Sequence, residues 1–218
     1  MPVMDGSPIE RLAAARLYFV TGRAPAALLR AACAGGADML QLRMKDCTDD
    51  EILDAAAVFR AVCHEFGALF WLNDRPDLAL AAGADGVHVG QDDISVSQAR
   101  SAVQGELLVG LSTHSPEQFE AGLHSGADQL SVGPVWETPT KPGRPAAGLD
   151  YVRHAASVDT DVPWFAIGGI DGSNVEQVVE AGASRIVVVR AIRDSADPRA
   201  AAAALCAALD RRPVGAAQ

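Results

Sequence analysis

The stretch Gly126-Ala127-Asp128-Gln129-Leu130-Ser131-Val132-Gly133 holds the main evidence for the fold, because the chain repeats its design four times. Each copy follows an alanine-rich segment, opens with glycine, alanine and a small polar residue, and runs into a short apolar strand. A glycine after a helix commonly takes the left-handed conformation that ends the helix, and the polar residue then leads the chain into a strand. The copies begin at Gly36, Gly83, Gly126 and Gly182.

Four further apolar runs, rich in leucine, β-branched and aromatic residues, lie before and between these copies. The eight expected strands alternate with helical segments, which is typical of a parallel sheet, because parallel strands need helical crossovers. Eight such units in about 200 residues predict a fold of the α/β class, namely a single (β/α)8 TIM barrel rather than an open doubly wound sheet. The further runs extend over residues 17–20, 69–73, 107–112 and 164–168.

The boundaries of the barrel follow from the first and last of these units. We expect the barrel to span residues 17–210, after an amino-terminal extension or helix at 1–16 and before a frayed tail at 211–218. A dinucleotide-binding fold would need a Gly-x-Gly-x-x-Gly turn after the first strand, and Thr21-Gly22-Arg23-Ala24-Pro25 is not one. The dinucleotide interpretation is therefore discarded.

The composition narrows the class of protein further. The chain has 218 residues with a net charge of −10, and 49% of them are hydrophobic. This suits one well-buried domain that binds no nucleic acid, because nucleic-acid-binding domains usually carry a basic stripe. The four cysteines lack CxxC spacing, which predicts reduced thiols. No signal peptide or bilayer-spanning run is recognisable, so we expect a soluble, cytoplasmic protein that contacts no membrane.

The ligand site of a TIM barrel is expected in the loops at the carboxyl ends of its strands. The loops after the second, third and fourth strands are unusually polar in this chain. Polar residues also end the fifth strand, where His114 could either cap a helix or take part in catalysis. His88 lies inside the fourth strand, where structural packing is its default interpretation. The polar loop residues are Gln41, Arg43, Lys45, Asn73, Asp74, Arg75, Gln91, Asp92, Asp93 and Ser112.

Charged residues at these ends indicate a magnesium diphosphate site. Asp74 and Asp93 end adjacent strands, which lie about 4.8 Å apart, so their carboxylates could converge on one ion. The chain has only two lysines against sixteen arginines, and both lysines, Lys45 and Lys141, follow strands. A lysine is a compact charge that fits beside a phosphate oxygen. The alternative is that Asp74 caps a helix, Asp93 is solvated in a loop, and the lysines have no function.

A second phosphate site is expected after the seventh and eighth strands. Gly168 and Gly169 would expose backbone N–H groups there, and Arg190 follows the eighth strand. A tight turn is the alternative use of the two glycines. The proline- and glycine-rich loop over residues 137–148 would be a lid above the site, or else a simple connector.

Seven motifs, in order along the chain and near the ends of most strands, together resemble the thiamine-phosphate synthase family. The likeness extends from about residue 17 to about residue 198. The motifs are Gln41-Leu-Arg43-Met-Lys45, Asn73-Asp74-Arg75, His88-Val-Gly-Gln91-Asp-Asp93, Gly110-Leu-Ser112-Thr-His114, Gly133-Pro134, Thr138-Pro-Thr140-Lys141 and Ile167-Gly168-Gly169-Ile170.

The resemblance implies a transferase for small-molecule substrates. It would join 4-amino-5-hydroxymethyl-2-methylpyrimidine diphosphate to 4-methyl-5-(2-phosphoethyl)thiazole, or to the carboxylated form of that thiazole, giving thiamine phosphate and diphosphate. Magnesium is the implied cofactor, with Asp74 and Asp93 as its ligands. Members of the family are often dimers, which leaves a homodimer as an option beside the monomer. The residues implied to bind the pyrimidine diphosphate are Gln41, Arg43, Lys45, Asn73, Ser112 and Lys141.

The resemblance also implies a dissociative reaction, in which diphosphate leaves before the thiazole nitrogen attacks. Arg43, Ser112 and Lys141 would then be catalytic by contacting the leaving group, and no nucleophilic side chain is needed. Members of the family often carry serine where this chain has Arg190, so a guanidinium is expected to replace a hydroxyl there. The residues implied to hold the thiazole phosphate are Thr138, Pro139, Thr140, Gly169, Val189 and Arg190.

Two other functions remain open at this point. A related barrel acts as a thiazole tautomerase, an isomerase in which His114 would be the acid or base. The diphosphate-binding residues argue against it, because proton transfer needs no such site. A regulatory protein that binds thiamine precursors without turnover is the non-enzymatic alternative.

Overall fold

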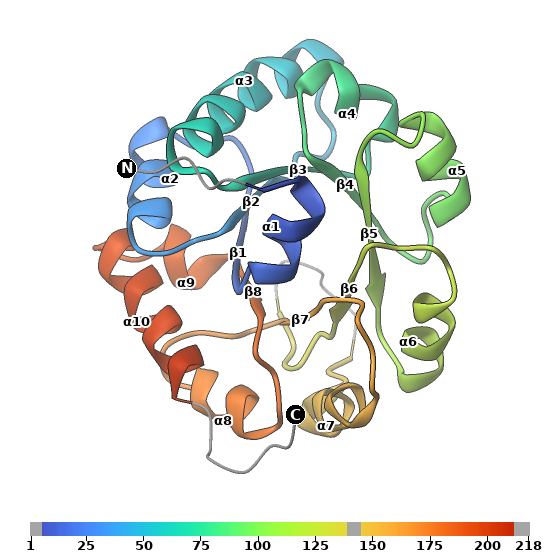
Figure 1. Ribbon diagram of the computed structural model, residues 1–218. Coiled ribbons are helices and arrows are strands. Elements are labelled where there is room, and N and C mark those ends of the chain that lie inside the picture. The colour runs from blue at the N-terminus through green and yellow to red at the C-terminus, as the bar shows by residue number, and fades with distance from the viewer. Residues whose placement is uncertain (1–5, 139–144, 212–218) are drawn as a thin grey trace.

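The computed structural model describes residues 6–138 and 145–211 and shows a closed barrel of eight parallel strands. Each strand pairs with the next in chain order, and β8 closes the barrel by pairing with β1 (Figure 1). The predicted (β/α)8 TIM barrel is therefore confirmed. The strands are β1 Leu17–Thr21, β2 Met39–Leu42, β3 Leu69–Asn73, β4 Gly86–Val89, β5 Leu108–Thr113, β6 Gln129–Val132, β7 Trp164–Ile167 and β8 Ile186–Val188.

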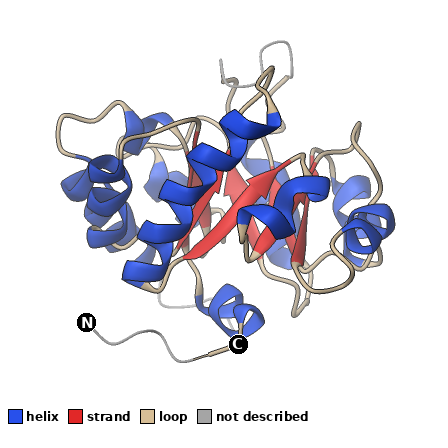
Figure 2. Ribbon diagram, turned by 90° about the horizontal axis from the view of Figure 1, so that it is seen from above, coloured by secondary structure: helices blue, strands red, loops and turns tan. Residues whose placement is uncertain are grey.

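Helices surround the barrel on its outside, as the view from above shows (Figure 2). They pack against the strands through the larger of two hydrophobic clusters. The longest of them, α3, spans Asp49–Phe66 and starts with a capping box formed by Thr48 and Glu51. The others are α1 Pro8–Ala14, α2 Ala26–Ala34, α4 Pro76–Ala82, α5 Val96–Ala102, α6 Pro116–Leu123, α7 Gly148–Ser157, α8 Val175–Glu180, α9 Arg190–Arg193 and α10 Pro198–Asp210.

The repeated glycine motif works in the structure as a junction between neighbouring strands. All four of its glycines have positive φ, between 67° and 107°. The aspartate that follows accepts backbone hydrogen bonds from the start of the preceding strand, as when Asp38 Oδ2 accepts from Arg16 N at 2.7 Å and from Leu17 N at 2.9 Å. Asp85 and Asp128 accept in the same way from Phe70 N and Val109 N. The three motifs with aspartate thus end a helix and align two strands, whereas the fourth has Ser184 at this position.

The first helix, α1, closes the end of the barrel at which the strands begin. It lies over the middle of the barrel in Figure 1, and its Leu12 is fully buried in the cluster of side chains that fills the barrel interior. Arg11 Nη2 donates to the carbonyl groups of Gly67 and Ala68, directly before β3. Arg185, directly before β8, donates to carbonyl groups of the α1 segment. The interior is therefore accessible from the opposite end.

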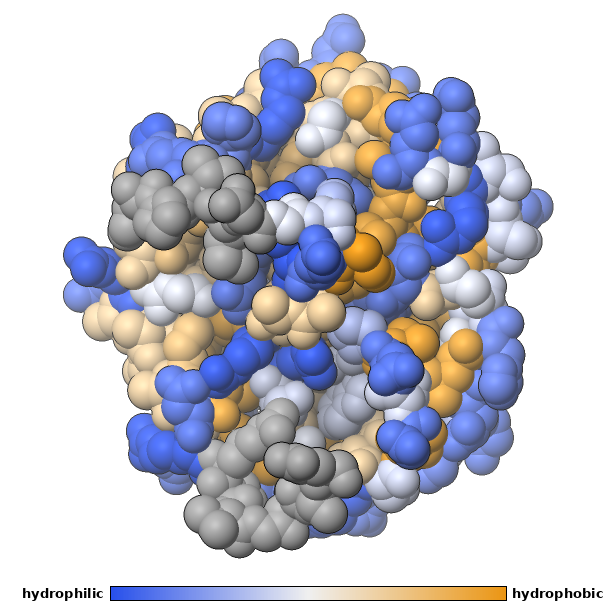
Figure 3. Space-filling view, in the orientation of Figure 1, coloured by the Kyte–Doolittle hydropathy of each residue, from blue (hydrophilic) through white to orange (hydrophobic). Residues whose placement is uncertain are grey.

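The face that carries α1 is mainly hydrophilic, with small, scattered hydrophobic patches (Figure 3). Among the described residues, the large hydrophobic side chains that are exposed are Ile9 and Ile94. No helix within residues 6–138 and 145–211 combines the length and apolar character that crossing a membrane requires.

Candidate active site

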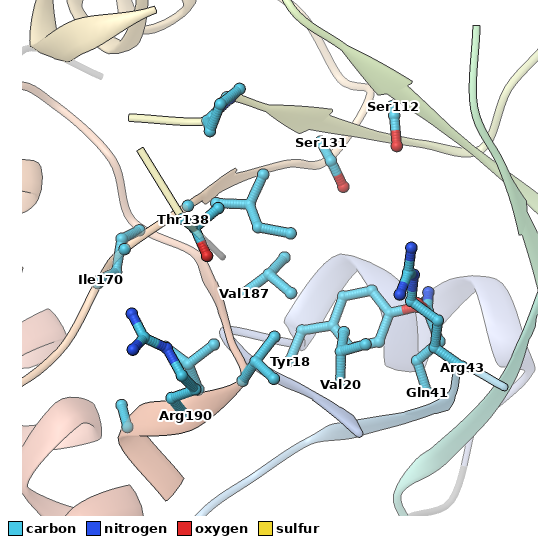
Figure 4. A pocket seen from close by; sticks show the side chains of 18 of the residues that line it. Tyr18, Val20, Gln41, Arg43, Ser112, Ser131, Thr138, Ile170, Val187 and Arg190 are labelled. Atoms are coloured by element: carbon cyan, nitrogen blue, oxygen red, sulfur yellow. The ribbon is translucent and has the colours of Figure 1, made fainter. Parts of the chain in front are cut away.

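A cavity of about 340 Å³ opens at the carboxyl ends of the strands and reaches into the barrel. Its walls come from all eight strands and from the segments that follow β2, β5, β6, β7 and β8. The strands contribute because every second side chain along each of them faces the interior. Figure 4 shows the side chains from β1, β2, β5, β6 and β8 that point toward this space. The lining residues that matter below are Tyr18, Gln41, Arg43, Asn73, His88, Ser112, His114, Ser131, Thr138, Gly169, Val189 and Arg190.

The floor of the cavity is formed by Tyr18 and Gln41. The Tyr18 ring is buried against Trp71 and Phe165, with ring centroids 6.1 and 5.8 Å away. Burial raises the pKa of Tyr18 well above its ordinary value, so the phenol is neutral. Gln41 Nε2 donates to Tyr18 Oη at 2.5 Å, which leaves the rest of the Gln41 amide available to a heteroaromatic ligand (Figure 4). The floor can therefore stack against such a ring and form hydrogen bonds with its edge.

A buried polar network forms the wall on the side of β4, β5 and β6. His88 Nε2 lies 2.9 Å from Ser112 Oγ, and His88 Nδ1 lies 3.2 Å from Gln129 Oε1. Gln129 Nε2 in turn lies 3.1 Å from Ser131 Oγ. All four side chains are buried, and the two serines and His88 line the cavity. Next to this network, His114 Nδ1 hydrogen-bonds Gly133 O at 2.6 Å.

Two arginines bring positive charge into the cavity from different sides (Figure 4). Arg43 follows β2, and its backbone N–H continues the sheet by donating to Thr21 O at 2.9 Å. Arg190 is the first residue of α9, directly after β8, and its guanidinium points toward Thr138 and Ile170. Each guanidinium can bind a phosphate group through charge-assisted hydrogen bonds.

The loops after β6 and β7 pack against each other at one side of the cavity. Val135 N donates to Ile167 O at 2.8 Å, and Asn174 Nδ2 donates to Gly169 O at 2.8 Å. Gly168 has φ 107°, and a Cβ there would lie 2.5 Å from Pro134 Cα. Only glycine permits this approach of two backbones. The predicted glycine pair is thus a close backbone junction beside the cavity.

A pair of carboxylates lies at the ends of β3 and β4. Asp74 has the left-handed φ of 59°, which is uncommon for a residue other than glycine, and Lys45 Nζ lies 3.5 Å from its Oδ2. Burial raises the pKa of Asp74, the adjacent Asp93 carboxyl raises it further, and Lys45 opposes both. Asp93 Oδ2 also accepts from Gly90 N at 2.7 Å. The carboxylates therefore repel each other in a way that a cation would relieve.

The expected alternative for Asp74 does not describe the structure, because Arg75 is the N-cap residue of α4. In the described part of the chain, no group of three or more His, Cys, Asp or Glu side chains is placed to hold a metal ion, and this includes the surroundings of the carboxylate pair. Two carboxylates without further protein ligands fit Mg²⁺, which commonly keeps several waters and binds substrate phosphate oxygens. They do not fit a structural zinc site.

The residues predicted from the sequence thus fall into three groups. Lys45, Asp74 and Asp93 form the charged cluster, outside the cavity lining. Pro139, Thr140 and Lys141, together with Arg144 of the expected lid, lie outside the described residues. The structure brings the remaining ones together around the cavity: Gln41, Arg43, Asn73, Ser112, Thr138, Gly169, Val189 and Arg190.

Sequence reasoning missed several residues that build the site. Tyr18, Gln129 and Ser131 were not expected there, and His88 was assigned to packing. The signal that could have found them is the two-residue period of strands: Gln129 and Ser131 alternate with the outward-facing Leu130 and Val132. Polar residues at alternate positions of an otherwise apolar barrel strand point into the interior.

Comparisons with known proteins agree with this geometry. A model of the thiamine monophosphate synthase family matches residues 17–192. A protein of Thermus thermophilus named thiamine-phosphate synthase is 54% identical over 197 residues, which cover 87% of this chain and 95% of the relative. Another so named, from Acidothermus cellulolyticus, is 51% identical over 205 residues, which cover 91% and 96%.

Solved structures give the same result. A thiamine phosphate pyrophosphorylase from Pyrococcus furiosus superposes with a TM-score of 0.82 at 30% identity, covering 92% of this chain and 98% of the other. A 3-hexulose-6-phosphate synthase superposes with a TM-score of 0.66 at 23% identity, covering 88% and 99%, and shares the fold. The family model covers most of the barrel and the relatives match nearly their full lengths, so the chain belongs to the thiamine monophosphate synthase family.

Proposed function

We propose that the protein is a thiamine-phosphate synthase. It joins 4-amino-5-hydroxymethyl-2-methylpyrimidine diphosphate to 4-methyl-5-(2-phosphoethyl)thiazole and releases diphosphate. The observation that carries this proposal is the pairing of two arginines on different sides of one cavity with a carboxylate pair outside its lining, where Asp74 directly follows the lining residue Asn73. The quoted relatives carry the synthase name, which favours this function over a thiazole tautomerase or a precursor-binding regulator.

The pyrimidine binds at the floor of the cavity in this proposal. Tyr18 and its aromatic neighbours offer an apolar surface, and the Gln41 amide offers hydrogen bonds to the edge of the ring. Asn73 is buried and lines the cavity; its side chain interacts with the Asp74 carboxyl and lowers the pKa of that group, but its Nδ2 lacks a hydrogen bond of ordinary geometry among the described residues. A buried donor without a partner is costly, so a ligand oxygen is its expected acceptor.

The diphosphate binds toward β2, β3 and β4, where Arg43 and Lys45 supply positive charge. Lys141, which lies outside the described residues, is assigned to the same phosphates from the family resemblance. Asp74 and Asp93 would hold Mg²⁺ there, since their mutual repulsion is relieved by a cation. When bound, the ion would neutralise part of the charge that develops on the leaving diphosphate. The chain's own cations act in the same direction and fix the orientation of the phosphates.

The thiazole phosphate binds on the other side, beside α9. The Arg190 guanidinium points into this part of the cavity, and Gly169 keeps the backbone there free of a side chain. A guanidinium grips a phosphate through two parallel hydrogen bonds, which fixes the direction of the attached ring. The other residues proposed for this pocket are Thr138, Pro139, Thr140 and Val189.

The chemistry proceeds without a nucleophilic side chain. The bond between the pyrimidine methylene carbon and the diphosphate oxygen breaks, and its electron pair leaves with the diphosphate. The lone pair of the thiazole nitrogen then forms the new C–N bond. Cys33 and Cys63 are buried in the outer cluster, and burial raises the pKa of Cys33 to about 12, so neither offers a thiolate. Positioning and charge compensation by Arg43, Lys141 and Ser112 are the protein's contribution.

The test is to incubate the purified protein with both substrates, with and without Mg²⁺, and to measure diphosphate and thiamine phosphate. A synthase forms both products only when Mg²⁺ is present, a tautomerase forms neither, and a regulator binds a precursor without turnover. Product formation at full rate in the presence of a chelator would contradict the metal assignment.

The metal ligands are tested by Asp93→Asn, which keeps the acceptor for Gly90 N but removes one negative charge. We expect kcat/KM to fall by about 100-fold at limiting Mg²⁺, with the folded state retained. In addition, Mg²⁺ should raise the melting temperature of the wild type and not that of the variant. Asp92→Asn is the matched control and should keep both responses.

A further inference from the structure

The buried network of His88, Gln129, Ser112 and Ser131 can exist in two hydrogen-bonding arrangements. The amide oxygen and nitrogen of Gln129 exchange places when the group turns by 180° about the Cγ–Cδ bond. Both ends of the amide already have polar partners, His88 Nδ1 at 3.2 Å and Ser131 Oγ at 3.1 Å. A neutral imidazole has one donor and one acceptor nitrogen, so it adapts to either orientation by changing its tautomer.

The two arrangements present different hydroxyl groups to the cavity. The structure holds the first arrangement, in which Gln129 Oε1 faces His88: Nδ1 must donate, Nε2 accepts from Ser112, and Ser112 offers only lone pairs to a ligand. If the amide nitrogen faces His88 instead, Nδ1 accepts and Nε2–H donates to Ser112 Oγ at 2.9 Å. The Ser112 hydroxyl proton is then free to point into the cavity, and Ser131 turns its proton toward Gln129.

A bound diphosphate favours the second arrangement, which the Gln129 amide reaches by turning from the orientation in the structure. Diphosphate oxygens accept hydrogen bonds and do not donate them, and their charge grows as the bond to carbon breaks. We propose that His88 is a positioning residue that directs the Ser112 hydroxyl toward the leaving diphosphate by donating Nε2–H to Ser112 Oγ. The inference rests on the proposed function. The change from the first arrangement to the second moves one proton of His88 from Nδ1 to Nε2, keeps the imidazole neutral and passes no proton to the ligand.

Gly110 is the residue that permits this network. A Cβ at Gly110 would lie 2.5 Å from Gln129 Oε1 and 2.6 Å from His88 Nδ1, between the two groups that must meet. It would also lie 2.9 Å from the Trp71 ring, which packs under the network. Gly110 pairs with His88 on one side and with Gln129 on the other. Because it has no side chain, His88 of β4 and Gln129 of β6 can form a hydrogen bond across β5.

The proposal is tested by a double-mutant cycle between His88 and Ser112. Asn at position 88 places an amide near Gln129 and loses the contact to Ser112, whereas Gln reaches the position of Nε2 and can donate to Ser112. We expect His88→Asn and Ser112→Ala each to lower kcat by about 10- to 100-fold, with KM for the pyrimidine diphosphate changed less. The double variant should be no slower than the slower single variant.

His88→Gln should recover most of the kcat that His88→Asn loses, because it restores a donor to Ser112. Losses that multiply in the double variant, or a His88→Gln variant as slow as His88→Asn at equal melting temperature, would overturn the proposal. If His88→Asn does not fold, Gln129→Met replaces it in the cycle, with the same expectation. Failure of the proposed function would show separately, as a wild-type protein that forms no thiamine phosphate.

Discussion

Arg190 shows how one side chain can define half of a binding site. It follows β8, begins α9 and points its guanidinium into the cavity beside Thr138 and Ile170. Arg43, which follows β2, lines the cavity on the other side. Because the two cations are separate, each can be removed without disturbing the other, and the effects on the two substrates should differ.

Arg190→Ala is expected to raise KM for the thiazole phosphate by about 10-fold or more, since a charge-assisted hydrogen bond to phosphate is lost. KM for the pyrimidine diphosphate should change much less. Steady-state kinetics with each substrate varied in turn measures both values. Arg193→Ala, on the same helix but paired with the exposed Asp194, is the matched control. Equal increases in both KM values would contradict the assignment of Arg190.

At the scale of residues, the sequence predicted lining residues at or just after the strand ends, such as Asn73 and Arg190, better than the polar residues inside β6. The roles of Asp74 and Asp93 in binding a metal stay a prediction. Gln129 and Ser131 do not stand out, since a polar residue within a strand can face water as well as the interior. Only the closure of the barrel decides that they face the cavity and meet His88 there.

At the scale of elements, the motif of glycine, alanine and aspartate explains why the strands were predictable. The glycine ends a helix through its positive φ, and the aspartate fixes the register to the preceding strand. Both effects are local, so they are visible in the sequence. Observed strand ends lie within one residue of the expected ones at most boundaries, and β3 spans Leu69–Asn73 as expected. The positions of α1 and α9 depend on tertiary contacts and were not predicted.

The junction aspartate Asp38 gives a pH dependence. Burial raises its pKa above the ordinary value, in spite of the two backbone hydrogen bonds that it accepts. The folded protein therefore holds this proton more tightly than the unfolded chain, and the contribution to stability falls as pH rises from the ordinary aspartate value through the raised one. The free energy of unfolding of the wild type relative to Asp38→Asn should fall over this range in urea titrations. A constant difference would contradict the raised pKa.

At the scale of the whole molecule, the barrel has one end for stability and one for function. Helix α1 covers the end where strands begin, and the cavity opens at the other. Leu12 is fully buried, so Leu12→Ala should lower the free energy of unfolding by about 2–4 kcal/mol. Both KM values should stay unchanged, as measured by denaturation and kinetics. Ile9→Ala, at an exposed position of the same helix, is the control and should change stability little.

The plug formed by α1 also has a consequence for the sequence of binding events. Because α1 closes the barrel at one end, a ligand enters the cavity from the other end. A ligand that contacts Tyr18, deep in the cavity, must therefore bind before a ligand that contacts Arg190, nearer the opening. The same geometry makes the deepest occupant the last to depart. We therefore expect an ordered rather than a random kinetic mechanism. The pyrimidine diphosphate binds first, and thiamine phosphate is released after diphosphate.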